Sequence, residues 1–194
     1  MGGDYYDFIP FGNDVFGKGV SADLQIARLM SDFRYISQFN PEPKKVLKQI
    51  NNILCERSYR GMFTTAVFCL LDTNKRTLTV ANGGHLSLLF KNEKNIEEIG
   101  HAGGTPLGIL PNVEYTQNKY SLKKGNQILI YTDGITEPKN KQQEEFGVTQ
   151  LKELFTNHDG SPQEFIQLLK ISIKNFIGDL PQFDDLISLA FKVI

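Results

Sequence analysis

The sequence predicts an α+β protein in which antiparallel sheets carry helices on their outer faces. Apolar residues recur at helical spacing in two places, within residues 21–54 and again within 148–176. Between these helical segments lie several short runs that are rich in β-branched and aromatic residues. Strands and helices thus come in separate runs, which favours antiparallel over parallel sheets. With 194 residues, 40% of them hydrophobic, the chain suffices for one domain with a sizeable core.

The first part of the chain is expected to form two helices. From Ser21 to Phe39 apolar residues recur at helical spacing, and Ser21 is a suitable N-cap. A second helix is expected after Pro41, with apolar residues from Val46 to Leu54 on one stripe. Both helices need a flat apolar surface to pack on.

Three runs supply that surface, namely MFTTAVFCLLD at 62–72, TLTVANGG at 77–84 and HLSLLFK at 85–91. Because turn-forming residues separate them, we expect a meander of antiparallel strands. After a glycine-rich loop, further strands are expected at 113–120 and 127–132.

The strand expected at 127–132 is strongly apolar and ends abruptly at Asp133-Gly134, where strand gives way to loop. Two helices should follow, at 148–155 and 162–176, and Ser161 with Glu164 forms the capping-box pattern for the second. Residues 184–194 should close the chain as a final strand.

Composition excludes several classes of protein. Lys and Arg (21) nearly balance Asp and Glu (22), so the basic surface of a nucleic-acid-binding protein is absent. The two cysteines form no CxxC motif, which favours a reducing compartment. No apolar run approaches the ~20 residues that span a bilayer, and the first residues do not resemble a signal peptide. We therefore expect a cytoplasmic protein without membrane insertion.

Four aspartates share one sequence context: each lies near a glycine or another aspartate, at the edge of an extended or apolar segment. They are Asp4, Asp14, Asp133 and Asp184. One such aspartate ordinarily marks a turn, but four carboxylates form the ligand set of Mg²⁺ or Mn²⁺. Zinc is disfavoured, because the three histidines are scattered. Two cations about 3.5–4 Å apart can lower the pKa of a bridging water and stabilise a phosphoryl group under attack.

Six motifs carry a family resemblance: GGDYYDF at 2–8, DVFGKGVSA at 14–22, NGGHLSLL at 82–89, GGTPLG at 103–108, YTDGITE at 131–137 and FDDLISLAF at 183–191. In this order they resemble the SpoIIE-like branch of the PPM-type protein phosphatases, bacterial regulators of sigma-factor switches. The resemblance covers residues 1–194 as a single phosphatase domain. It implies a four-layer α-β-β-α sandwich of two antiparallel sheets, with a metal centre in a cleft at one end.

The resemblance also implies roles for individual residues. The two ions, Mn²⁺ or Mg²⁺, would be held by Asp4, Asp14, Asp133 and Asp184 with the backbone carbonyl of Val15. Asp185 would be either a direct ligand or a partner of a ligand. Asp7 would act outside the ligand set or make a contact with a helix or turn. Lys18, between two glycines, is placed to meet a phosphate, although one loop lysine is more often only solvated.

The implied activity is the hydrolysis of phosphoserine or phosphothreonine on a protein by a metal-bound hydroxide. The implied substrate is a phosphorylated anti-sigma-factor antagonist, a small STAS-type domain. Relatives often carry sensory or regulatory regions upstream, and a homodimer is compatible with the sequence. The alternative is a catalytically inactive module of the same fold that binds such a partner. The four aspartates argue against this alternative, because closely placed carboxylates repel one another unless a cation is present.

Two local features complicate the N-terminal region. GNDVFGKG at 12–19 fits most of a P-loop, but Gly19 stands where the Mg²⁺-binding Ser or Thr belongs, and no βαβ pattern surrounds it. In addition, only residues 11–13 separate DFIP from Asp14, where relatives have most of a β-hairpin. This predicts that residues are absent here, with a chain break near Gly12–Asn13. A normal bond at that position would contradict the prediction.

Overall fold

The computed structural model describes residues 6–7, 24–57, 63–93, 95–181 and 185–194. They form two compact units, each continuous in space but not in sequence. The first contains the described residues up to His85 together with Ala102–Ser121, and the second contains Leu86–His101 and Leu122–Ile194. The described residues contain antiparallel sheets and helices, which confirms the predicted α+β class. The single phosphatase domain over residues 1–194 stays a prediction.

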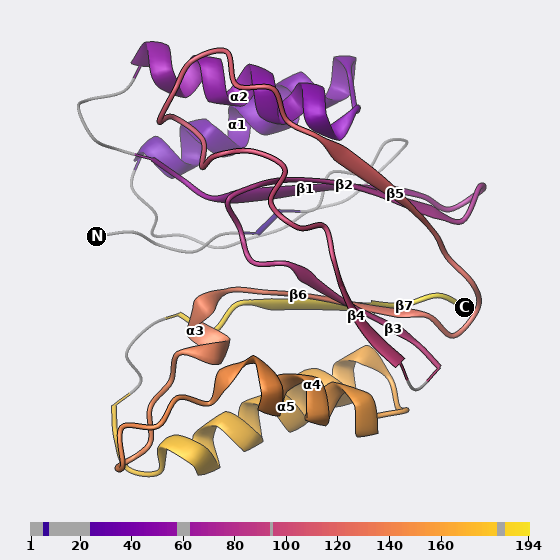
Figure 1. The fold of residues 1–194 in the computed structure, drawn as a ribbon, viewed down its shortest axis with the longest axis vertical. Helices are drawn as coiled ribbons and strands as arrows, with labels where there is room; N and C mark the ends of the chain where they lie inside the picture. The colour runs from indigo at the N-terminus through magenta and orange to yellow at the C-terminus, as the bar shows by residue number, and fades with distance from the viewer. Residues whose placement is uncertain (1–5, 8–23, 58–62, 94, 182–184) are drawn as a thin grey trace. The chain divides into compact units, whose positions relative to one another are not determined.

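The first unit holds a three-stranded antiparallel sheet with the strand order β1-β2-β5. The strands cover Ala66–Asp72 (β1), Thr77–Gly83 (β2) and Gln117–Ser121 (β5). Two helices, α1 (Leu24–Phe39) and α2 (Pro43–Arg57), lie on one face of this sheet (Figure 1). Both helices fall where the sequence predicts them, while the expected N-cap Ser21 lies outside the described residues.

The core of the first unit is built on the apolar stripe of α2. Val46, Leu47 and Ile50 are fully buried and belong to one cluster with Ala81 of β2 and Leu107. Burying each such aliphatic side chain stabilises the fold by roughly 1.5–3 kcal/mol. This stripe therefore holds α2 on the sheet.

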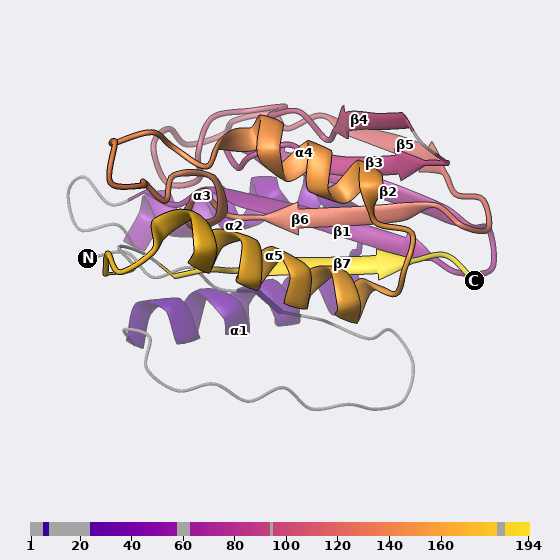
Figure 2. The same cartoon turned by 90° about the horizontal axis from the view of Figure 1, so that it is seen from below.

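The second unit holds a four-stranded antiparallel sheet with the strand order β4-β3-β6-β7. The strands cover Leu88–Asn92 (β3), Asn95–Ile99 (β4), Gln127–Tyr131 (β6) and Ser188–Lys192 (β7). Figure 2 shows α4 and α5 lying across this sheet, α4 against β3 and β4 and α5 along β7.

The helices of the second unit are α3 (Asp133–Thr136), α4 (Gly147–Asn157) and α5 (Pro162–Ile177). The rings of Phe155 and Phe165 join α4 to α5, with centroids 4.9 Å apart, and both side chains are fully buried. The capping box at the start of α5 is confirmed, because Ser161 and Glu164 satisfy each other's backbone N–H groups. The short helix α3 is not predicted by the sequence.

The predicted meander is wrong, because β3 does not pair with β2 but belongs to the other sheet. The connection between them is an irregular turn held by Asn82, whose Oδ1 accepts from the His85 N–H and whose Nδ2 donates to the His85 carbonyl. Gly84 adopts φ +81°, and a Cβ there would lie 2.7 Å from the ring of Pro106. The chain therefore does not form a tight hairpin between β2 and β3 but passes from one sheet to the other.

Two other strand boundaries differ from the prediction. β5 begins at Gln117 instead of residue 113, because the chain before it is bound to the glycine-rich loop: the Tyr115 hydroxyl donates to the Thr105 carbonyl, and the Thr116 N–H to the Gly103 carbonyl. β7 begins at Ser188, and described residues 185–187 before it are not strand. None of the helices in the described ranges has the length and apolar character needed to cross a bilayer.

Candidate metal centre

Asp133 lies at the end of a buried strand, where its backbone is held on both sides. In β6, Ile128 and Leu129 are fully buried and Tyr131 is 4% exposed. Immediately beyond Asp133 the chain enters α3, and Ile135 is buried in the same cluster as Leu129 and Tyr131. The carboxylate itself is exposed. Tyr131 and Ile135, both buried, thus fix the backbone position of the exposed Asp133.

The neighbouring strand brings a second aspartate to the same end of the sheet. β6 and β7 pair through Tyr131 and Ser188, and the Thr132 N–H extends the pairing by donating to the Ile187 carbonyl at 3.1 Å. Asp133 follows Thr132 in the chain, and Asp185 lies two residues before Ile187. Asp185 is also exposed. Two exposed carboxylates therefore lie just beyond the same end of β6 and β7.

The local geometry of Asp133 suits a cation ligand. Its Oδ1 accepts a hydrogen bond from the Gly134 N–H at 2.9 Å, and its backbone carbonyl accepts from the Glu137 N–H at 2.8 Å. Within the described part of the chain, no side chain pairs with the second carboxylate oxygen, Oδ2. An exposed, oriented carboxylate oxygen is the donor that Mg²⁺ and Mn²⁺ prefer. The residues present therefore fit such an ion.

Beside this carboxylate, Tyr131 stays neutral. Burial, together with the charge of Glu98, raises the pKa of the Tyr131 phenol. Glu98 is itself paired with Lys152, at 2.6 Å. The phenol therefore adds no charge next to Asp133 in the neutral range.

The remaining predicted site residues are Asp4, Asp14, Val15, Lys18 and Asp184, all outside the described residues. The predicted chain break near Gly12–Asn13 lies outside them as well. Among the residues that the structure describes, no group of three or more His, Cys, Asp or Glu side chains could hold a metal ion. The full ligand set stays a prediction; of its residues the structure describes Asp133, together with Asp185, the predicted further ligand or partner of a ligand.

Asp7, for which two roles were open, makes a helix contact. Its carboxylate receives two hydrogen bonds from Arg34 of α1, Nε to Oδ2 at 2.6 Å and Nη2 to Oδ1 at 2.8 Å. A two-point guanidinium–carboxylate pair fixes orientation as well as distance. Asp7 is thereby attached to α1.

Comparison with solved structures defines the class of the fold. The SiaA-PP2C domain of Pseudomonas aeruginosa superposes with a TM-score of 0.77 at 18% identity, over 88% of this chain and 70% of that chain. The PP2C phosphatase domain of SpoIIE from Bacillus subtilis, solved with a fragment of its regulatory domain, gives 0.73 at 20% identity, over 93% and 52%. The fold is thus that of PPM-type phosphatase domains, α+β with two antiparallel sheets and flanking helices.

Sequence comparison then gives the family. The family described as Stage II sporulation protein E (SpoIIE) matches residues 11–194, so this chain belongs to it. Protein IcfG of Synechocystis sp. is 26% identical over 98% of the chain, and the phosphoserine phosphatase RsbU of Bacillus subtilis is 32% identical over 71%. The chain spans 36% of the first relative and 43% of the second. The IcfG alignment extends over 225 residues, more than the 194 of this chain, so that relative has residues without a counterpart here.

Proposed function

We propose that this chain is a metal-dependent serine/threonine phosphoprotein phosphatase that hydrolyses phosphoserine or phosphothreonine. The observation that carries the proposal is the pair of exposed carboxylates, Asp133 and Asp185, at the same end of β6 and β7. They belong to the motifs YTDGITE and FDDLISLAF in a chain of the SpoIIE family. The name of its relative RsbU, a phosphoserine phosphatase, supports the same reaction.

The proposed ligand set consists of carboxylate and carbonyl oxygens, which suits two Mn²⁺ or Mg²⁺ ions. It comprises Asp4, Asp14, Asp133 and Asp184 with the backbone carbonyl of Val15. Asp185 would be a further ligand or the partner of one. When bound, two such ions supply positive charge that activates a water and stabilises the phosphoryl group.

The residues of the chain supply position and charge for that chemistry. The β6 strand and α3 hold Asp133 rigidly, so little reorganisation is needed when an ion binds. The close carboxylates repel one another in the absence of a cation, which makes the site selective for positive charge. Lys18, between Gly17 and Gly19, would meet a phosphate oxygen of the substrate.

The proposed substrate is a phosphorylated anti-sigma-factor antagonist of the STAS type, acting in the cytoplasm. Support comes from the family and from relatives named as phosphoserine phosphatases, RsbU and RsbP of Bacillus subtilis. The relatives IcfG and RsbU are longer than this chain, which supports further regions in the whole protein. A homodimer is a separate part of the proposal.

The test compares Asp133→Ala with Asp179→Ala, a control at an exposed carboxylate of the same unit. Asp133→Ala should abolish Mn²⁺-dependent hydrolysis of a phosphoserine protein and the rise in Tm caused by Mn²⁺. Without metal its Tm should stay near the wild-type value, because no core volume is removed. Asp179→Ala should keep both the Mn²⁺-dependent hydrolysis and the rise in Tm caused by Mn²⁺. Undiminished turnover by Asp133→Ala would refute the assignment, and metal binding by the wild type without turnover would favour the inactive binding module.

A further inference from the structure

Thr132 carries a buried hydroxyl without a partner next to the proposed metal ligand Asp133. Its Oγ1 is shielded from solvent and makes no hydrogen bond within the described residues. Thr132 occupies the N-cap position of α3, yet its side chain does not cap the helix. Native proteins rarely bury a hydroxyl without a partner, because the group loses its hydrogen bonds to water. This oxygen therefore needs an explanation.

The backbone of Thr132 is already fully used. Its N–H donates to the Ile187 carbonyl at 3.1 Å, and its carbonyl accepts from the Ile135 N–H at 3.0 Å. Its φ of −100° and ψ of 169° are those of an extended strand residue. The residue is thus fixed between β7 and α3, and only rotation about its side-chain bond can bring the hydroxyl to a partner.

The strand register indicates which partner that is. The Thr132 N–H is bonded to the Ile187 carbonyl, and Asp185, two residues before Ile187, is the described carboxylate of the segment that leads into β7. A hydroxyl donates well to a carboxylate, and a donor of this kind commonly orients acids in metal sites.

We propose that Thr132 is a positioning residue for the metal centre: in the metal-loaded protein its hydroxyl donates to the carboxylate of Asp185 and fixes the orientation of that acid. This inference rests on the proposed function, since it assumes that an ion binds at Asp133. It also assigns Asp185, one residue after a proposed ligand, the role of a partner and not that of a direct ligand.

The test uses Thr132→Val, which keeps the shape and removes the hydroxyl, and Thr132→Ser, which keeps the hydroxyl. Each variant is measured for Tm without metal and for Mn²⁺ affinity by calorimetry. Thr132→Val should have an unchanged or higher Tm without metal, because a buried orphan oxygen is replaced by a methyl group. Its Mn²⁺ affinity should fall about tenfold or more, as for other partners of metal ligands. Thr132→Ser should bind Mn²⁺ nearly as the wild type does.

Asp185→Asn completes a double-mutant cycle. It should weaken Mn²⁺ binding to a similar degree, and combining it with Thr132→Val should add little, because both changes remove one interaction. A lower Tm of Thr132→Val without metal would overturn the proposal, because the hydroxyl would then have a purely structural partner. Wild-type Mn²⁺ affinity in Thr132→Val, with binding lost in Asp133→Ala, would overturn it while leaving the proposed function intact. Absence of Mn²⁺ binding by the wild type would overturn both.

Discussion

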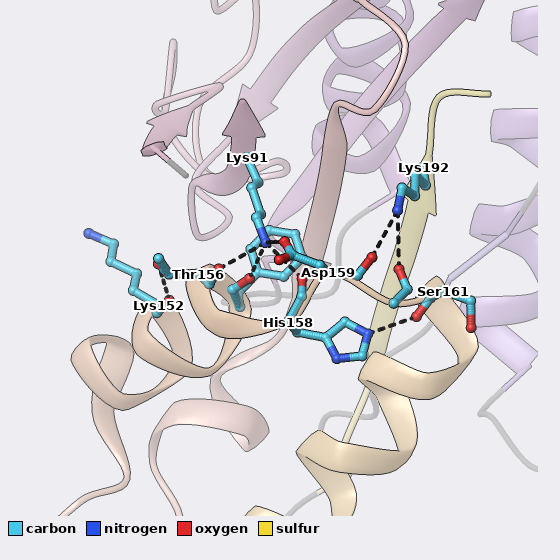
Figure 3. Close-up of polar contacts among 9 residues, drawn as sticks. Lys91, Lys152, Thr156, His158, Asp159, Ser161 and Lys192 are labelled. Carbon is cyan, nitrogen blue, oxygen red and sulfur yellow. Dashed lines mark hydrogen bonds and ion pairs between the residues drawn. The ribbon is translucent and has the colours of Figure 1, made fainter. Parts of the chain in front are cut away.

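The ammonium of Lys91 lies 2.7 Å from the carbonyl oxygen of His158, the residue that follows α4 (Figure 3). Lys91 sits on β3, an interior strand of its sheet, and is only 2% exposed. The same nitrogen donates to the carbonyls of Phe155 and Thr156 and to the carboxylate of Asp159. The last carbonyls of a helix have no partner within it and attract positive charge. Lys91 therefore reaches from the sheet to the end of α4 and supplies hydrogen bonds to its last carbonyls.

Replacing Lys91 by Met should destabilise the protein by about 3 kcal/mol, because hydrogen bonds from a charged donor are lost and buried carbonyls remain without partners. Lys192→Met is the matched control, since Lys192 binds the Asp159 and Gly160 carbonyls from the less buried end of β7. It should cost about 1 kcal/mol or less. Urea denaturation measures both changes. Equal losses in the two variants would contradict the role given to Lys91.

The burial of Lys91 could not be predicted from the sequence. The run HLSLLFK correctly predicts a strand, but a lysine at the end of a strand is ordinarily exposed, and nothing local indicates that α4 ends above it. Periodicity reports which segments are helices and strands, and both helical pairs were predicted in this way. Pairing between segments depends on distant contacts, such as the Pro106 ring against Gly84 that accompanies the change of sheet.

The ligand set of the candidate site stays a prediction made from sequence motifs. Asp133 and Asp184, with Asp185 as a ligand or a partner, are proposed because each lies in a short motif at the edge of an apolar segment. Thr132 was missed, since a threonine at a strand end is unremarkable until its buried hydroxyl and its bond to Ile187 are known. Asp7 was recognised as part of a motif, but its partner Arg34 is distant in the sequence. Sequence motifs therefore indicate which acids matter better than they indicate what orients them.

Asn51 of α2 should be essential for holding the glycine-rich loop. It is fully buried, its Oδ1 accepts from the Gly108 N–H at 2.9 Å, and its Nδ2 donates to the Leu110 carbonyl at 2.8 Å. Asn51→Ala should lower the free energy of unfolding by about 2–3 kcal/mol, because two backbone groups lose their partners. Asn52→Ala, which removes an exposed bond to the Asn112 N–H, should cost about 1 kcal/mol or less. Chemical denaturation distinguishes them, and similar values would contradict the prediction.

The capping box of α5 should make stability depend on pH in acid. Hydrogen bonds from the Ser161 backbone and side chain hold the pKa of Glu164 below its ordinary value of 4.5. A depressed carboxyl pKa adds stability that is complete above pH 4.5 and is lost as the pH falls through the folded-state pKa. The Tm difference between wild type and Glu164→Ala should therefore be largest near neutral pH and shrink below pH 4.5. Glu153→Ala, at an exposed site on α4, serves as the baseline, and a constant Glu164 difference across this range would contradict the prediction.

Two arginine–aspartate pairs involve α1, and they should differ in their effect on metal binding. Arg34 binds Asp7, whereas Arg57 of α2 binds Asp32 at 2.5 Å. Each arginine is substantially exposed, so Arg34→Ala and Arg57→Ala should each reduce stability by about 1 kcal/mol or less. Only Arg34→Ala should also weaken Mn²⁺ binding, because Asp7 lies three residues from the proposed ligand Asp4 and Arg34 fixes its orientation. Calorimetric Mn²⁺ titration of both variants provides the measurement. If both bind Mn²⁺ with the wild-type affinity, the contact with Asp7 anchors the chain without orienting the metal centre.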